Sequence, residues 1–316
     1  MNIHLKILIL VIIFIIFNII YINYFRSKYD QFENTNKKKR YAICIWGELR
    51  GVKSTINSFY EHLVNPLNGD VFILCQQTNE KDVDENINLF EKDVIMKSLY
   101  PKPDTKEVFK DIDRLRDLDK NMLYEGGLQV FLNFKKIADE YGDIFERDYD
   151  YILLTRSDFK YLFNIPDVMN LSKTNNLFWS FEDDNHGGIN NNLSIIPSNK
   201  IKDYLYSAYN YLTKPKLINK ILRNNVPLNC EKLMKFIFTN EKWPIGLIKS
   251  NCYITADSLN EKTTWGSFKY SNQYNTFYKY QVQFNNAYNN LETFKNGDKW
   301  EYFDLSMYNY RIITFL

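Results

Sequence analysis

Short apolar runs alternate with segments of helical character along the first half of this chain. The runs that read as strands cover 41–46, 70–75, 94–96 and 151–155. The segments that favour helices, most clearly the last of them, cover 52–63, 106–118 and 127–145. Strands separated by helices pair in parallel through right-handed crossovers. The alternation therefore predicts an α/β fold in which helices flank a mixed, mostly parallel sheet.

The second half of the chain is less regular. Further short strands are expected at 177–181 and 193–196, and helices at 200–212, 217–223 and 230–239. Residues 244–255 favour a pair of strands or an extended run, and the aromatic, Asn-rich stretch after 257 receives no assignment. No internal repeat and no Pro/Gly-rich linker interrupts 40–316. A single domain is therefore expected over this range.

Residues 1–25 are expected to form an N-terminal transmembrane helix. An almost unbroken apolar run occupies 7–22, and no small-residue cleavage site follows it, which disfavours a cleaved signal peptide. Residues 26–39 are polar and basic and are expected to form a stalk. By the positive-inside rule these basic residues favour a cytosolic domain, whereas anchored enzymes of the secretory pathway have the opposite arrangement. The sequence predicts a single-pass membrane protein and leaves the side of the membrane open.

Composition and motifs exclude several classes of function. The formal net charge of +2 does not provide the strongly basic face that a nucleic-acid partner requires. The chain has no Walker loop, G-x-G-x-x-G, G-x-S-x-G or H-E-x-x-H, which disfavours P-loop transferases, Rossmann dehydrogenases, α/β-hydrolases and zincins. Three histidines and four widely spaced cysteines favour neither a histidine-rich metal site nor a disulfide framework.

Two strand ends hold residues that could carry chemistry. The first strand runs into Gly47 and Arg50, and the strand at 151–155 ends on Arg156 and Asp158. Glycine lets the backbone approach a ligand closely, and arginine can pair with a phosphate. An aspartate beyond the carboxyl end of a strand can hold a divalent cation. The plain alternative at both places is an exposed turn.

A third candidate segment is the acidic loop at 182–188. It contains three successive carboxylates, which repel one another, so that some of them need a cation, a role as a base or free solvent. Gly187 and Gly188 would let a substrate pass close to the backbone. The plain alternative is a solvated acidic loop.

Together these segments resemble a glycosyltransferase family of large DNA viruses and bacterial surface-polysaccharide loci. In that family a Gln-bearing helix leads to a strand with the pattern Y-D-(apolar)-R-x-D. The residues of this chain that match are Gly47 and Arg50, Asn65-Pro66, Gln129, Tyr149-Asp150, Arg156-Ser157-Asp158, Gly187-Gly188, the run at 195–198 and Glu231. The resemblance covers roughly 40–257.

The resemblance implies a GT-A-like fold, a nucleotide-sugar donor and a glycan, protein or lipid acceptor. It implies that the donor is bound by Gly47, Arg50, Gln129, Arg156 and Asp158. Asp158 would also hold a Mn²⁺ or Mg²⁺ ion that bridges the donor diphosphate, although R-x-D has one acid where D-x-D has two, so metal dependence stays open.

By the same resemblance, His186, Gly187 and Gly188 would lie at the acceptor. A base for the acceptor hydroxyl would be a carboxylate, and the candidates, left unranked, are Asp183, Asp184 and Glu231.

The sequence thus predicts a membrane-anchored, R-x-D-type glycosyltransferase. One alternative is a non-catalytic, membrane-tethered module that keeps a transferase-like fold for binding. The other is a sulfotransferase-type enzyme, which would need a phosphate-binding loop after the first strand that the sequence W-G-E-L-R does not provide.

Overall fold

The computed structural model describes residues 39–77, 85–90, 94–109, 125–171, 177–183, 186–226, 229–261, 266–296 and 302–304. The chain divides into two compact units, Met1–Lys39 and Arg40–Leu316, and the described residues belong almost entirely to the second. The predicted transmembrane helix at 1–25 and the stalk up to residue 38 lie outside the described residues. Within the described part, no helix combines the length and the apolar character that crossing a membrane requires.

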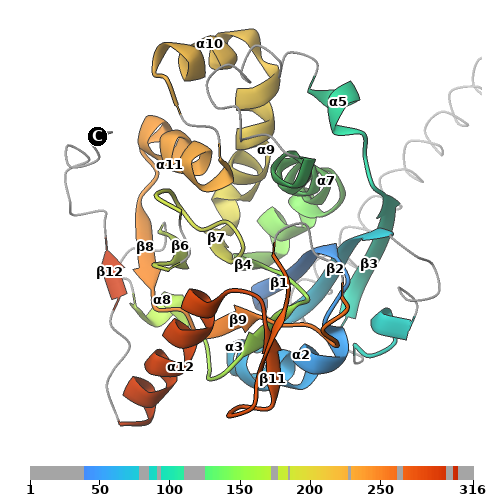
Figure 1. Ribbon diagram of the computed structural model, residues 1–316. Helices are drawn as coiled ribbons and strands as arrows, with labels where there is room; N and C mark the ends of the chain where they lie inside the picture. Colours follow the sequence, from blue (N-terminus) through green and yellow to red (C-terminus); the bar gives the residue numbers. More distant parts are fainter. Residues whose placement is uncertain are drawn as a thin grey trace, which may run out of the picture. The chain divides into compact units, whose positions relative to one another are not determined.

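An eight-stranded sheet forms the centre of the second unit (Figure 1). Its strand order is β12-β8-β6-β7-β4-β1-β2-β3. The strands are β1 (Lys39–Glu48), β2 (Asp70–Gln77), β3 (Val94–Pro101), β4 (Tyr149–Thr155), β6 (Phe178–Phe181), β7 (Ser194–Pro197), β8 (Ile245–Ile248) and β12 (Tyr302–Asp304). β2 pairs in parallel with β1 and β3, and β6 with β8, whereas β7 is antiparallel to β4 and β6, and β12 to β8. The predicted mixed, mostly parallel sheet is confirmed.

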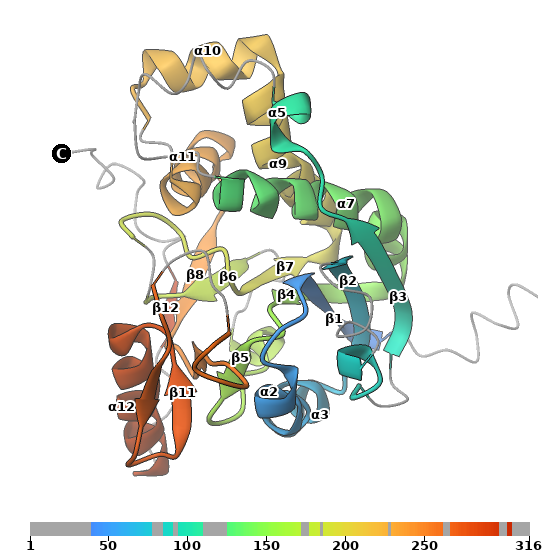
Figure 2. The same ribbon diagram turned by 45° about the vertical axis from the view of Figure 1, so that its right-hand side comes forward.

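Helices cover both faces of the sheet (Figure 2). One face carries α5 (Thr105–Val108), α7 (Glu125–Asp148), α9 (Ile201–Thr213), α10 (Pro215–Arg223) and α11 (Cys230–Glu241). The opposite side carries α2 (Val52–Phe59), α3 (Asn65–Leu67) and α12 (Gln281–Lys295). Residues of the π-helical turn η1 (Tyr60–Val64) and of α8 (Val168–Leu171) belong to the same core as α2.

The first strand is apolar from Tyr41 to Trp46 because both of its faces are buried there. Cys44 and Trp46 belong to the core beneath α7 and α9, whereas Ile43 and Ile45 belong to the core beneath α2. Side chains of a strand alternate between the two faces of a sheet, so a strand covered on both sides needs an almost continuous apolar run. This pattern places the polar residues that follow the run at the edge of the sheet.

The structure departs from the sequence prediction mainly after residue 244. The segment at 244–255 does form two strands, β8 and β9 (Cys252–Ile254), but β9 pairs with β5 (Phe159–Tyr161) in a separate two-stranded sheet. The unassigned stretch after 257 contains the hairpin strands β10 (Lys269–Ser271) and β11 (Thr276–Tyr278) and the helix α12. Of the predicted helix at 106–118, only the part up to residue 109 is described.

Candidate functional site

The ends of β1 and β4 meet at one edge of the sheet. The backbone N–H of Arg50 donates to the Ser157 hydroxyl oxygen at 3.1 Å, and this hydroxyl lies 3.1 and 3.0 Å from the carbonyl oxygens of Glu48 and Arg50. The Thr55 hydroxyl donates to the Ser157 carbonyl at 2.7 Å. Ser157 therefore connects, through hydrogen bonds, the segment after β1 and the segment after β4, two of the three candidate segments predicted from the sequence.

Asp158 is held between two guanidinium groups. Arg50 donates from Nε to Oδ2 of Asp158 at 2.7 Å, while Arg156 donates from Nε to Oδ1 at 2.8 Å and from Nη2 to Oδ2 at 2.7 Å. The Asp158 side chain is only 1% exposed, whereas Arg50 and Arg156 are 17% and 20% exposed. The carboxylate therefore lies behind the two guanidiniums, which reach the surface.

The charges of this cluster stabilise one another. Burial by itself raises the pKa of Asp158, but the charges and hydrogen bonds of Arg156 and Arg50 outweigh it and hold that pKa well below its usual value. The carboxylate of Asp158 in turn raises the pKa of Arg50. Asp158 is the carboxylate that both guanidiniums share, and the carboxylates of Glu48 and Glu261 also act to raise the pKa of Arg50. Glu48, which is more exposed, lies 3.6 Å from Nη1 of Arg50.

Backbone packing fixes Asp158 from behind. Gly51 has φ of +63°, and a Cβ atom there would lie 3.3 Å from Cβ of Asp158 and 3.2 Å from the Thr255 carbonyl oxygen. The Thr255 N–H donates to the Asp158 carbonyl at 2.9 Å. Gly51 is thus needed both for its backbone conformation and for its close approach to Asp158.

A cavity of about 160 Å³ opens beside the two guanidiniums. Four of the five predicted donor-binding residues line it, and these are Gly47, Arg50, Gln129 and Arg156. Asp158 does not line the cavity, because it lies behind Arg50 and Arg156. Trp46 also lines the cavity, and within the described residues its indole N–H is buried without a hydrogen-bond partner.

A network of buried amides forms the other side of this cavity. Gln76 Nε2 donates to Oε1 of Gln129 and to Oδ1 of Asn133, both at 2.9 Å. Gln129 Nε2 donates to the Pro103 carbonyl at 2.8 Å, and the Tyr100 hydroxyl donates to Asn133 Oδ1. Because buried amides need partners, each of these side chains is fixed in orientation.

Sequence reasoning found Gln129 and missed Gln76, Asn133 and a further cavity-lining residue, Lys102. Gln76 directly follows the apolar run of β2, the same signal that identified Arg156. Asn133 lies four residues after Gln129, and therefore on the same face of α7.

Asp183 lies two residues beyond the end of β6, and hydrogen bonds connect its backbone carbonyl to Arg156. Arg156 Nη1 donates to Asn192 Oδ1 at 3.4 Å, the Asn192 N–H donates to Asn190 Oδ1 at 2.8 Å, and Asn190 Nδ2 donates to the Asp183 carbonyl at 2.9 Å. Burial raises the pKa of Asp183, an effect that hydrogen bonds from Ser250 and Asn286 partly offset. Asp184 lies outside the described residues.

The predicted acceptor residues of the third segment, and the base candidate Glu231, lie at or near the start of α11. A Cβ atom on Gly188 would lie 2.0 Å from the carbonyl carbon of Glu231, so this glycine is required by packing against α11. Glu231 lies in the first turn of α11, where a carboxylate suits the helix dipole. His186 and Gly187 form an exposed turn with φ of +45° and +82°. Packing against α11 explains Gly188, and the start of the helix explains Glu231, without a role for either residue in binding or catalysis.

Glu261 is a carboxylate near the cluster that sequence reasoning missed. Burial raises its pKa, and Arg50 and Asp158 lie close enough to act on that pKa in opposite directions. Its Oε2 accepts from the Asp257 N–H at 2.9 Å, while Oε1 is buried without a hydrogen-bond partner in the described part of the chain. Glu261 lies in the stretch after 257, where apolar residues follow neither a helical nor a strand period, and no motif in the sequence indicates a function for it.

The groups around Asp158 do not fit a divalent cation. Both of its oxygen atoms accept hydrogen bonds from guanidiniums at 2.7–2.8 Å, and a metal ion there would have to displace them against the repulsion of two positive charges. Among the described residues, no group of three or more His, Cys, Asp or Glu side chains is arranged to hold a metal. The geometry of these donors does not support the metal-binding role predicted for Asp158.

No protein-family model and no curated protein matches this chain. Solved structures that are similar to part of it include mouse xyloside xylosyltransferase 1 in its apo form, with 9% identity and a TM-score of 0.42, covering 66% of this chain and 85% of that one. Another is the glycosyltransferase GlyE of Streptococcus pneumoniae TIGR4, with 14% identity and a TM-score of 0.37, covering 64% and 43%. A third is the bifunctional glycosyltransferase WbbM, with 12% identity and a TM-score of 0.34, covering 56% and 34%. The chain spans less than half the length of these last two structures. All three structural neighbours are glycosyltransferases.

Proposed function

We propose that this chain is a glycosyltransferase whose Arg50 and Arg156 bind the diphosphate of a nucleotide-sugar donor. The observation that carries the proposal is the pair of guanidiniums that share one buried carboxylate and line a cavity. Arginine presents a planar fork of donors that matches phosphate oxygens. Because Asp158 fixes both forks before a ligand arrives, they need little reorganisation when charge develops on the leaving group.

In the transfer, the oxygen of the acceptor hydroxyl forms a bond to the anomeric carbon, the bond between that carbon and the diphosphate breaks, and negative charge accumulates on the departing diphosphate. Arg50 and Arg156 lie where they can stabilise that charge, with Lys102 as a third cation at the cavity. The phosphate would replace the exposed carboxylate of Glu48, which lies 3.6 Å from Arg50, as a partner of this arginine. The buried amides of Gln76 and Gln129 offer the uncharged part of the nucleotide fixed hydrogen-bonding groups.

The proposal is tested by measuring the melting temperature of the full chain in detergent with a panel of nucleotide sugars, with and without Mn²⁺. A donor that binds the folded state raises the melting temperature, and we expect the rise for at least one diphosphate sugar to persist in EDTA. The purified chain should also hydrolyse that donor slowly. Stabilisation by no donor would favour the binding module, and stabilisation by a sulfate-donor nucleotide alone would favour the sulfotransferase-type alternative.

We propose Asp183 as the base that deprotonates the acceptor hydroxyl. Burial raises the pKa of its carboxyl group, which supports this role. A chain of hydrogen bonds from Arg156 to the backbone carbonyl of Asp183 fixes the position of its backbone relative to the arginine. A base acts only when ionised, so transfer should decline as the pH falls through a value above the usual aspartate pKa of about 3.9. Asp183→Asn is expected to lower the rate of transfer by about 10²–10⁴-fold and to remove this acidic limb, while donor binding persists.

Glu261→Gln is the comparison for this experiment, because burial also raises the pKa of Glu261, which lies close enough to Arg50 and Asp158 to be affected by their charges. We expect Glu261→Gln to retain the acidic limb of the rate profile. If the acidic limb of the rate profile were lost in Glu261→Gln and kept in Asp183→Asn, Glu261 would be the base instead of Asp183.

We infer in addition that residues 1–25 anchor the enzyme in a membrane as a single span, and that its acceptor is a glycan, protein or lipid. The apolar run at 7–22 supports the anchor. Resistance of the full chain to extraction from membranes by alkaline carbonate would agree with this inference, and complete extraction would contradict it.

A further inference from the structure

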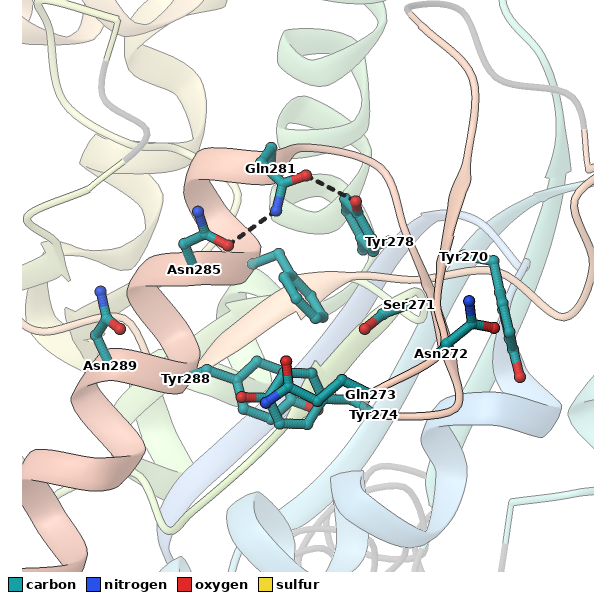
Figure 3. A pocket seen from close by; sticks show the side chains of 11 residues that line it. Tyr270, Ser271, Asn272, Gln273, Tyr274, Tyr278, Gln281, Asn285, Tyr288 and Asn289 are labelled. Atoms are coloured by element: carbon teal, nitrogen blue, oxygen red, sulfur yellow. Dashed lines mark hydrogen bonds between the residues drawn. The ribbon is translucent and has the colours of Figure 1, made fainter.

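A second cavity, of about 490 Å³, lies between the β10–β11 hairpin and α12. Figure 3 shows the side chains of the hairpin turn facing those of the helix across it. Its lining consists of four tyrosines, a phenylalanine, five side-chain amides and a serine, and none of these residues is charged. The volume falls in the range of roughly 300–1,000 Å³ that is common for small-molecule sites.

Two pairs of stacked aromatic rings line this cavity. Tyr278 stacks on Phe284 with ring centroids 4.3 Å apart, and Tyr274 of the hairpin stacks on Tyr288 of α12 at 3.7 Å. Tyr274 remains 38% exposed although it is a large aromatic residue. Rings held in this way offer flat apolar surface without needing to be ordered by a ligand.

Amide groups surround the rings. The Tyr278 hydroxyl donates to Gln281 Oε1 at 2.7 Å, and Gln281 Nε2 donates to Asn285 Oδ1 at 2.8 Å, so these amides are fixed in orientation (Figure 3). Within the described residues, the side chains of Gln273 and Asn289 have no hydrogen-bond partner, and both residues are exposed. They can therefore donate to and accept from a ligand without breaking an existing bond.

We propose that this cavity binds a neutral sugar residue of an acceptor glycan. A sugar ring has apolar faces that suit the tyrosines and uncharged hydroxyls that suit the amides. A phosphate or carboxylate would enter a lining that has no cation to pair with it, at a cost in desolvation. This assignment of the substrate class rests on the proposed transferase function.

The cavity is joined to the candidate active site through β11. Thr255 donates from its backbone N–H to the Asp158 carbonyl at 2.9 Å and from its hydroxyl to the Phe277 carbonyl at 2.7 Å. Phe277 precedes Tyr278, which lines the cavity. On the helix side, Asp183 accepts a hydrogen bond from Asn286 of α12. A glycan bound here would thus contact β11, which Thr255 connects to the R-x-D segment, and α12, which is hydrogen-bonded to the proposed base.

The test measures binding of neutral trisaccharides (cellotriose, xylotriose, mannotriose, maltotriose and chitotriose) to the full chain by saturation-transfer NMR and calorimetry. We expect at least one to bind, and Tyr274→Ala to weaken that binding about tenfold. Gln273→Ala, on the exposed turn, should weaken it without affecting the fold. Val282→Ala is the matched control, because Val282 lies on α12, is 70% exposed and does not line the cavity.

The donor-dependent rise in melting temperature separates the two proposals. If a donor stabilises the protein and no trisaccharide binds, or if binding is unchanged in both Tyr274→Ala and Gln273→Ala, the sugar-binding assignment is overturned. Binding of uridine that is lost in Tyr274→Ala would likewise overturn it in favour of a nucleobase pocket. Trisaccharide binding that depends on Tyr274, without stabilisation by any donor, would support the cavity and contradict the transferase.

Discussion

Replacing Asp158 with asparagine is expected to abolish sugar transfer and to lower the free energy of unfolding by roughly 3–5 kcal/mol at neutral pH. The substitution removes the negative charge that pairs with Arg50 and Arg156 while leaving both guanidiniums largely buried. It also releases the two forks from the positions in which they would meet a diphosphate. Denaturant unfolding measures the stability, and transfer from the donor found in the screen measures the activity.

The pH dependence of this effect has a definite sign. The guanidiniums hold the pKa of Asp158 below its usual value, so the ion pair stabilises the fold above the unfolded-state value of about 3.9, and this contribution is lost as the pH falls through the lower folded-state value. The stability difference between the natural protein and Asp158→Asn should therefore shrink in strong acid. Asp143→Asn is the control, because Asp143 forms an exposed pair with Lys202 and should change nothing measurable. If Asp158→Asn had the same unfolding midpoint and the same transfer activity as the natural protein, the role proposed for the buried carboxylate would be ruled out.

Arg156→Gln is expected to lower kcat/KM for the donor by about 10²–10³-fold. Arg156 lines the cavity and donates two hydrogen bonds to Asp158, so its remaining donors are aimed by the same carboxylate that orients Arg50. Arg156→Lys keeps the charge but loses the planar fork, and it should recover only part of the activity. Steady-state kinetics and the affinity for the product nucleotide measure both variants.

Arg147→Gln serves as the control for the arginine variants, since Arg147 is exposed and forms its ion pair with the neighbouring Asp148. It should match the natural protein in both assays. Nucleotide affinity that is unchanged in Arg156→Gln, in a protein with a normal melting temperature, would place the donor phosphates elsewhere.

The sequence predicted the sheet and its edge because burial on both faces leaves a clear pattern. β1, β2 and β4 each contain an apolar run, and the polar residues that follow each run lie outside the core. Arg50, Arg156 and Asp158 could therefore be placed at one edge, and they do lie there together. Gln76 marks the end of β2 by the same rule and was predictable in principle.

Contacts between distant segments could not be predicted in this way. Whether Asp158 faces a ligand or two guanidiniums depends on how the chain at Arg50 approaches it from 108 residues away. Gly188 gives no sign in the sequence that its missing side chain makes room for Glu231. The stretch after 257 has short strands and an aromatic bias without a period, so the hairpin, α12 and Glu261 were missed.

The sequence by itself determined which residues are buried in the sheet and which lie at its edge, because the periodicity of burial is local. Only the tertiary structure decided that Asp158 positions two arginines and that the tyrosines after 257 enclose a cavity. These outcomes depend on side chains far apart along the chain, whose charges and shapes interact only once the sheet has brought them within a few ångströms.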